Sequence, residues 1–206
     1  MQEVGTDSRL SRAEFLSSGA KRGVAVAVAG AAFGAFAEDA AADPLSDNDL
    51  ALARMLVGTE LLAIDFYQRA IAAARLGPVG QKYLRRALAD EIEHNRTVSE
   101  ILSGAGYTPA TAADFQFSYP RSTFTSAGAI TKLARLLETT FLGAYLGAVG
   151  LIEAQSLVQP LARISASEAQ HLILWGIELG GRPLSEAFPA PLMPDQVTVT
   201  LDQFTA

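Results

Sequence analysis

The strongest constraint on this chain is a helical periodicity that carries ionisable residues on its apolar side. Between Leu84 and Leu102, apolar residues recur at spacings of three and four, which predicts one face of an α-helix. Glu91 and His94 fall on that same face, whereas Asp90 falls on the opposite, solvated side. A carboxylate and an imidazole among core leucines need partners, because burying an unpaired charge is costly.

The same motif occurs a second time. His171 follows Glu168 by three residues, so both histidines of the chain carry the pattern Glu-x-x-His. The second copy also lies on an apolar helical face, continued by Ile164 and Trp175. Trp175 itself is expected to be a core residue. Two copies of a rare pattern indicate a shared site.

Two lone acids complete the set. Glu60 and Glu138 fall on the apolar faces of two further predicted helices, 31 residues before Glu91 and 30 residues before Glu168 respectively. Each lone acid is followed seven residues later by a tyrosine, which is either a partner of the cluster or ordinary core: Tyr67 and Tyr145. The chain therefore reads as two copies of one helical hairpin, related by a pseudo-twofold axis that brings six side chains together.

The remaining periodicity predicts an all-α fold. Ser46 offers a cap for the first helix, and a capping box of Ser156 with Gln159 is expected to open the last one. The connection over 105–122 is too long for a helix turn and suits a crossover between two hairpins. The predicted helices span 46–76, 79–103, 125–153 and 157–179, within a four-helix bundle over 46–182.

After the bundle, residues 183–206 contain several prolines and no helical stripe, and alternation appears in the last dozen residues. This segment is expected to be an irregular tail that packs on the bundle surface. Within the third helix, Gly143, Gly147 and Gly150 are expected to let another helix approach closely. Asp65 is expected to face solvent.

The N-terminus has the features of an export signal. Basic residues precede an uncharged run over 23–37, which ends in a small-x-small cleavage pattern. The segment SRAEFL resembles the twin-arginine export motif, with Ala13 in place of the second arginine. We expect a signal peptide over 1–37, a linker over 38–45 and export to the periplasm or beyond, by the twin-arginine route. The alternatives are a membrane anchor or a packed helix, although the run is short for a span, and no stable span is expected after cleavage.

Composition narrows the chemistry. The chain has no cysteine, which excludes disulfides, thiolate chemistry and cysteine-held metals, so any metal must be held by carboxylates and histidines. A net charge of −6 without a basic cluster argues against nucleic acid as a partner. The 206 residues, 50% of them hydrophobic, suit one domain with a sizeable core.

The six residues carry a recognisable resemblance. A Glu from each of two helices and Glu-x-x-His from each of the other two is similar to the ligand set of ferritin-like di-iron and dimanganese carboxylate bundles. The segments ETTFLGAYLGAVGLIEA, SASEAQH and EAFPAPLMPDQV look like the exported ferritin-like proteins that include the desiccation-related proteins. The resemblance implies a ferritin-like four-helix bundle with two Fe ions, two Mn ions or a mixed pair, held by Glu60, Glu91, His94, Glu138, Glu168 and His171.

The expected function is redox chemistry at this centre. Oxidation of Fe(II) by dioxygen or peroxide would serve metal handling or protection from oxidative or drying stress. Two alternatives stay open: a structural or stress-protective bundle whose metals only hold it together, and a cage-forming iron store. The long crossover and the proline-rich tail speak against a cage, so a monomer or dimer is favoured. The expected partners are metal ions and dioxygen or peroxide.

Overall fold

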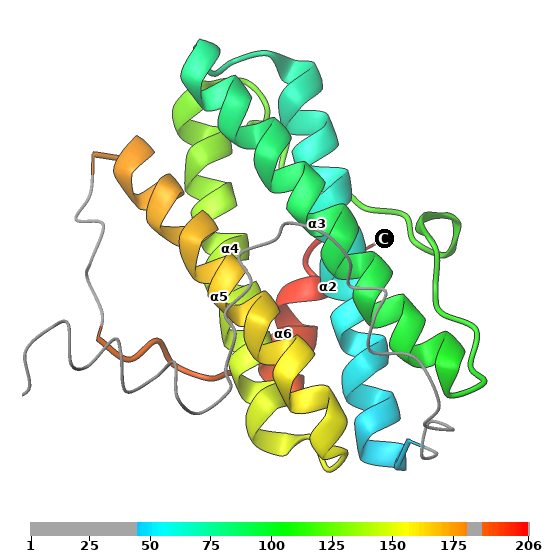
Figure 1. Cartoon of the computed structure of the whole chain (residues 1–206). Coiled ribbons are helices and arrows are strands. Elements are labelled where there is room, and N and C mark those ends of the chain that lie inside the picture. The colour runs from blue at the N-terminus through cyan, green and yellow to red at the C-terminus, as the bar shows by residue number, and fades with distance from the viewer. Residues whose placement is uncertain (1–44, 181–186, 206) are drawn as a thin grey trace, which may run out of the picture. The chain divides into compact units, whose positions relative to one another are not determined.

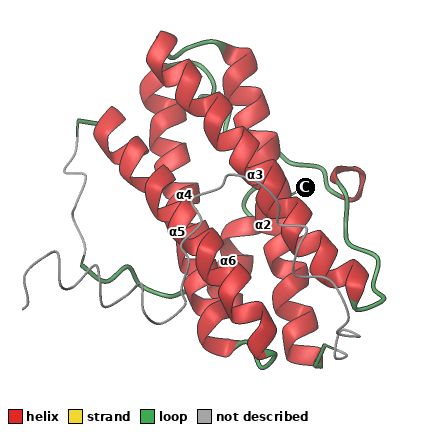
Figure 2. Ribbon diagram, viewed as in Figure 1, coloured by secondary structure: helices red, strands yellow, loops and turns green. Residues whose placement is uncertain are grey.

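The four predicted helices are all present in the computed structural model, which describes residues 45–180 and 187–205. The helices are α2 (Asp47–Ala73), α3 (Pro78–Gly104), the short 3-10 helix η2 (Ala112–Asp114), α4 (Ala127–Leu151), α5 (Gln155–Glu178) and α6 (Pro194–Leu201). The described part contains helices and loops and no strand, which confirms the all-α prediction (Figure 2). The predicted signal peptide and the linker up to residue 44 lie outside the described residues.

The four long helices form two hairpins. Helix α2 packs mainly on α3, and α4 packs mainly on α5. The connection between α3 and α4 runs along the bundle from one end to the other (Figure 1), as the predicted crossover requires. The largest fully buried side chains include Tyr67, Tyr145 and Trp175. No helix among the described residues is long and apolar enough to cross a membrane.

The helix ends show where local signals hold and where packing overrides them. Ser46 caps α2 as predicted, because its side chain accepts a hydrogen bond from the Asp49 backbone N–H. The capping box predicted at Ser156 is wrong: α5 begins two residues earlier than expected, at Gln155, with no side-chain cap of its own. Instead, the buried Asp49 carboxylate accepts hydrogen bonds from the backbone N–H groups of Glu153 (2.8 Å) and Ala154 (2.9 Å). A cap supplied from another helix is invisible in the local sequence.

Helix α2 also ends earlier than predicted, at Ala73 rather than Leu76. Ala74 adopts a left-handed conformation, with φ of 52°, and its N–H bonds to the Ile71 carbonyl. Leu76 is buried and packs on Gly80, where a Cβ atom would lie only 2.6 Å from the leucine Cδ2. Because Leu76 is buried against Gly80, the chain turns after Ala73, although the helical periodicity of the sequence continues to Leu76.

The tail departs from the prediction of an irregular segment. Residues 194–201 form helix α6, which packs on both α2 and α4, and Val197 is fully buried. The alternating Val-Thr run has strand character by propensity, but an eight-residue helix is stabilised by what it buries rather than by propensity. Near the end of the chain, the Ser118 N–H donates to the Phe204 carbonyl at 2.7 Å, which joins the tail to the crossover.

Gly143 and Gly147 of α4 contact the tail rather than another helix, so the expectation of a close helix approach was wrong. The Leu192 N–H donates to the Gly143 carbonyl at 2.8 Å. A Cβ atom at Gly147 would lie 2.0 Å from the Leu192 carbonyl oxygen, and Gly150 has open space around it. Gly147 therefore lets the tail backbone lie directly on α4.

Candidate metal centre

Each long helix brings ionisable side chains into the core. The acids of α2 and α4 sit one turn after buried apolar residues, and α3 and α5 each add an acid and an imidazole on their inner faces. The periodicity that turns core leucines inward also turns these side chains inward. The histidines keep 8% and 4% exposure and the four acids at most 1%. The six residues are Glu60, Glu91, His94, Glu138, Glu168 and His171.

Both imidazoles point their Nδ1 atoms at carboxylates of the facing helix. His94 Nδ1 lies 2.9 Å from Glu168 Oε1, and His171 Nδ1 lies 3.0 Å from Glu91 Oε1. Each histidine thus reaches the acid of the other Glu-x-x-His motif. This reciprocity is the pseudo-twofold relation predicted from the sequence.

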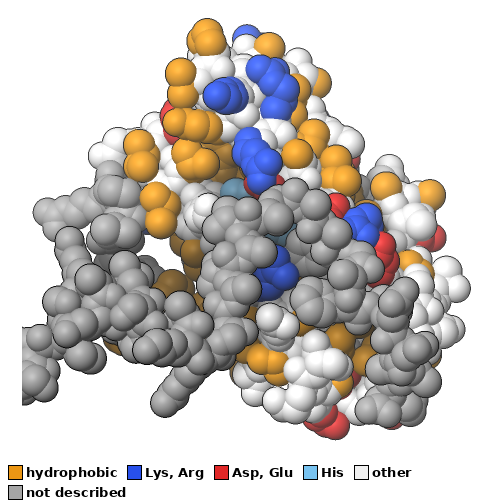
Figure 3. All heavy atoms as spheres, viewed as in Figure 1, with side chains coloured by type: hydrophobic (Ala, Val, Ile, Leu, Met, Phe, Trp, Pro, Cys, Tyr) orange, Lys and Arg blue, Asp and Glu red, His pale blue; other side chains and the backbone are white. Residues whose placement is uncertain are grey.

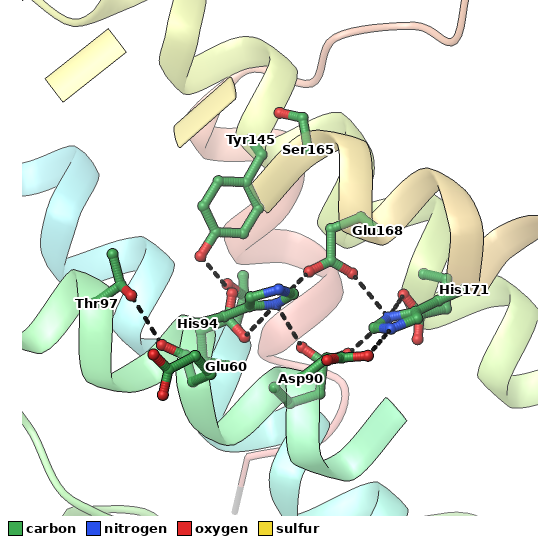
Figure 4. Close-up of polar contacts among 12 residues, drawn as sticks. Glu60, Asp90, His94, Thr97, Tyr145, Ser165, Glu168 and His171 are labelled. Atoms are coloured by element: carbon green, nitrogen blue, oxygen red, sulfur yellow. Dashed lines mark hydrogen bonds and ion pairs between the residues drawn. The ribbon is translucent and has the colours of Figure 1, made fainter. Parts of the chain in front are cut away.

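The six side chains form two overlapping groups. We call Glu60, Glu91, His94 and Glu168 the His94 subsite, and Glu91, Glu138, Glu168 and His171 the His171 subsite. In each group the candidate ligand atoms lie within 4.8 Å of one another. Figure 4 shows the Glu168 carboxylate between the two imidazoles. Glu91 and Glu168 belong to both groups, so two ions held here would share these two residues.

The two tyrosines contact the lone acids of the opposite hairpin. The Tyr67 hydroxyl in α2 donates to Glu138 Oε1 in α4. The Tyr145 hydroxyl in α4 donates to Glu60 Oε1 in α2 (Figure 4). Each hydrogen bond fixes one oxygen of a lone acid and leaves the other facing the subsites.

Asp90 does not lie on a purely solvated face, as its position in the helical pattern predicted. Its Oδ2 lies 3.4 Å from His171 Nε2, and its Oδ1 pairs with the exposed Arg86. A carboxylate behind a histidine fixes the imidazole's tautomer and orientation. Asp90 thus directs the Nδ1 lone pair of His171 into the site.

Burial and mutual repulsion disfavour charge on the lone acids. Burial raises the pKa of Glu60 well above its ordinary value, and the nearby Glu91 and Glu168 add to the shift. Burial and Glu168 raise the pKa of Glu138 in the same way. Burial acts against ionisation of Glu168 too, but the facing imidazoles of His171 and His94 outweigh it and lower its pKa to about 2. The metal-free site therefore holds protons on some acids and charge on others.

In contrast to the lone acids, both imidazoles are favoured in their charged, protonated form. Burial alone would lower the pKa of His94, yet Glu168 and Glu91 raise it to about 9. The pKa of His171 is also raised, by Asp90 and the site carboxylates against the effect of burial. Since an imidazolium has no lone pair for a metal, binding of a cation must displace these protons.

The donor set fits two divalent cations. Several buried atoms lack a hydrogen bond of good geometry, although some of them lie within ion-pairing distance of one another across the site: Glu60 Oε2, Glu91 Oε1, Glu138 Oε2, both Glu168 oxygens and His171 Nδ1. A buried polar atom without a partner costs about 1–3 kcal/mol, which a metal ion would relieve. Four carboxylates with two neutral imidazoles carry a charge of −4, and two divalent cations cancel it.

Sequence reasoning brought the six central residues together but missed two of their supports. The helical pattern predicts a solvated Asp90, although this residue directly precedes Glu91, because its contact with His171 is with another helix. Trp175 was assigned to the core; it is fully buried, and its indole Nε1 also donates to the Tyr67 hydroxyl at 2.9 Å. Helical periodicity predicts on which face of its helix a residue lies, but it does not predict which residue of another helix it contacts.

Comparison with known proteins adds an independent result. A family model described as the ferritin-like domain matches residues 48–175. Among solved structures, the chain is similar to a conserved hypothetical protein from Mycobacterium tuberculosis, with a TM-score of 0.57 and 24% identity, covering 69% of this chain and 97% of the other. That likeness concerns the fold alone. No curated protein matches the chain, and the closer relation to the desiccation-related proteins stays a prediction.

Proposed function

Since the chain belongs to the ferritin-like domain family, we propose that its buried cluster binds two iron or manganese ions and oxidises Fe(II) with dioxygen or peroxide. The observation that carries this proposal is the pair of overlapping subsites sharing Glu91 and Glu168. Ligation by carboxylate oxygens with one imidazole per ion suits iron and manganese. The biological role would be metal handling or stress protection.

When bound, a pair of redox-active ions would supply electrons for the reduction of dioxygen or peroxide. The protein's part is to hold and orient the ligands. Tyr67 and Tyr145 fix one oxygen of each lone acid, and Asp90 fixes the His171 ring. The surrounding core excludes bulk water, which strengthens each electrostatic contact inside.

Small molecules need a route to the site. His94 keeps 8% of its surface exposed. Figure 3 shows histidine atoms at the surface of the face formed by α3 and α5, close to basic and acidic side chains. Helices α3 and α5 share few contacts compared with the two hairpins. The seam between α3 and α5 is therefore the proposed entrance for ions and oxidant.

The test is stopped-flow absorbance after anaerobic Fe(II) loading and mixing with oxygen or peroxide. We expect a near-ultraviolet rise in the wild type and its loss in Glu91→Gln. The matched control is Glu93→Gln on the same helix, a half-exposed residue paired with Arg96, which should leave the signal unchanged. Metal that raises the melting temperature without any oxidation would overturn the redox proposal and favour the structural alternative.

The size of the assembly in solution distinguishes the proposed monomer or dimer from the cage-forming iron store. Size-exclusion chromatography of the loaded protein should give a monomer or dimer. An assembly of about two dozen subunits would support iron storage instead.

We further propose that the protein is exported, with residues 1–37 removed as a signal peptide. The motif at residues 11–16 and the cleavage pattern before residue 38 support this proposal. Intact mass of the protein recovered from outside the cytoplasm tests it. A mature N-terminus near residue 38 is expected, and full-length protein confined to the cytoplasm would contradict it.

A further inference from the structure

An unbroken series of aromatic rings leads from the buried site to the surface of the bundle. The Tyr67 ring contacts Phe66, with centroids 5.3 Å apart, and Phe66 contacts Tyr119 at 6.2 Å. Tyr67 and Phe66 are fully buried or nearly so, whereas Tyr119 in the crossover is partly exposed. We call Tyr67, Phe66 and Tyr119 the aromatic relay.

The inner end of the relay is joined to the site by a hydrogen bond. The Tyr67 hydroxyl donates to Glu138 and accepts from the Trp175 indole, which stacks on its ring at a centroid distance of 6.1 Å. Tyr145, the symmetry counterpart of Tyr67, has no such tryptophan, since Val98 stands where the duplication would place one. The relay is thus specific to one half of the bundle.

The outer end of the relay has a carboxylate that accepts a hydrogen bond from the Tyr119 hydroxyl. The Tyr119 hydroxyl donates to Asp65 Oδ2 at 2.9 Å, so the predicted solvent-facing acid has a specific partner. Arg69 pairs with Asp65 at 2.8 Å and lies over the Tyr119 ring at 5.3 Å. A surface pocket of about 450 Å³ lies beside this group, lined by Asp65, Arg69 and Phe117 among others.

We propose that Tyr119 is the residue through which electrons enter the protein from a small one-electron reductant in solution and pass through Phe66 to Tyr67 and the buried site. This inference rests on the proposed redox function. Tyrosine can be oxidised by one electron if its proton has an acceptor, while phenylalanine serves only as a bridge between rings in contact.

The step balances with peroxide as the oxidant. Reduction of one hydrogen peroxide to two water molecules takes two electrons and two protons, and both of these protons come from solvent water. One electron comes from Tyr119: its O–H bond breaks, the proton moves to Asp65 and the electron moves inward. Bound Fe(II) would supply the other electron and would become Fe(III). A reductant in the adjoining pocket then returns an electron to Tyr119, and Asp65 returns the proton.

The experiment uses iron-loaded protein mixed with peroxide in the presence of a nitroso spin trap, followed by peptide mass spectrometry to locate the trapped radical. We expect an adduct on Tyr119 in the wild type. It should be lost in Tyr119→Phe and reduced at least about tenfold in Phe66→Leu, which interrupts the ring contacts. The matched control is Tyr107→Phe, because Tyr107 is also partly exposed beneath an arginine, Arg54, but has no ring contact with the relay.

Absorbance recorded in the same samples reports separately on iron oxidation. Iron oxidation without an adduct on Tyr119, or with equal adducts on Tyr119 and Tyr107, overturns the relay and leaves the proposed function standing. An adduct that persists in Phe66→Leu overturns the path. Absence of iron oxidation overturns the proposed function, and the relay with it.

Discussion

The two subsites share two carboxylates and a similar arrangement of ligand-type residues, yet their surroundings differ. In the His171 subsite, Asp90 supports the imidazole from behind, and Trp175 supports the tyrosine that holds Glu138. In the His94 subsite, no acidic side chain of the described residues lies within ion-pairing distance of His94 Nε2. Ser167 occupies the position equivalent to Asp90.

This difference separates the residues that both hairpins share from those that only one hairpin has. Both halves keep the ligand-type residues and the tyrosine, since all are needed to assemble the cluster. The supporting residues differ, and outer partners typically change metal affinity by about 10–100-fold. We therefore expect the His171 subsite to bind the first metal ion and the more exposed His94 subsite to bind and exchange the second.

The largest effect is expected where the subsites overlap. Glu168→Gln removes a charge from both, so the metal content should fall from about two ions per chain to nearly none. Plasma mass spectrometry of protein loaded anaerobically with Fe(II) or Mn(II) measures this content. Retention of one tightly bound ion would show that Glu168 serves a single subsite and that the overlap is not functional.

Separate removal of each histidine tests the metal retention of the two subsites one at a time. His94→Ala should leave about one ion, held tightly by the His171 subsite. His171→Ala should leave a weakly bound ion that is lost on dialysis against a chelator. Equal retention in the two variants would mean that the subsites are equivalent.

A smaller effect on metal affinity is expected from the loss of Asp90, the carboxylate behind the His171 imidazole. Asp90→Asn should weaken the first binding step by about 10–100-fold, as expected for loss of a carboxylate behind a histidine ligand. Ser167→Ala at the equivalent position is the matched control and should change affinity little. Competition with a coloured chelator measures both. If the two variants behave alike, Asp90 does not distinguish the subsites.

The smallest effect concerns the stability of the metal-free protein. The pKa of His94 is raised in the folded state to about 9, above an unfolded value of about 6.5. The stabilisation it brings is complete below pH ~6.5 and is lost as the pH rises towards 9, at a rate of up to about 1.4 kcal/mol per pH unit for one proton. Thermal melts should therefore show a melting temperature that falls by several degrees over this window.

Metal-loaded protein is the control for that melt. Its imidazoles have already lost their protons, so its melting temperature should stay nearly constant over the same window. A metal-free protein that is equally insensitive to pH would contradict the proton-holding description of the site.

Much of this site could be predicted because the helical periodicity and the repeated motif can both be recognised in the sequence. The spacing of Glu91 and His94, repeated by Glu168 and His171, is enough to place each pair on the inward face of its helix. The resemblance to the ferritin-like superfamily is confirmed by the family match. The role of Asp90 could not be predicted in this way, because its contact with His171 depends on how far apart α3 and α5 pack.

The less predictable parts depend on contacts distant in sequence. Asp49 caps α5 from about a hundred residues away, which replaced the expected capping box. The run at 197–200 becomes helical because α6 buries Val197 against α2 and α4. In each case a tertiary contact outweighs a local preference.

The most direct test of a dinuclear site is the number of metal ions held by the mature protein after anaerobic loading with Fe(II) or Mn(II), measured beside a His94→Ala/His171→Ala double variant. We expect about two ions per chain in the wild type and nearly none in the variant, as a site held by both histidines requires. No bound metal in the wild type, or the same content in both proteins, would contradict it.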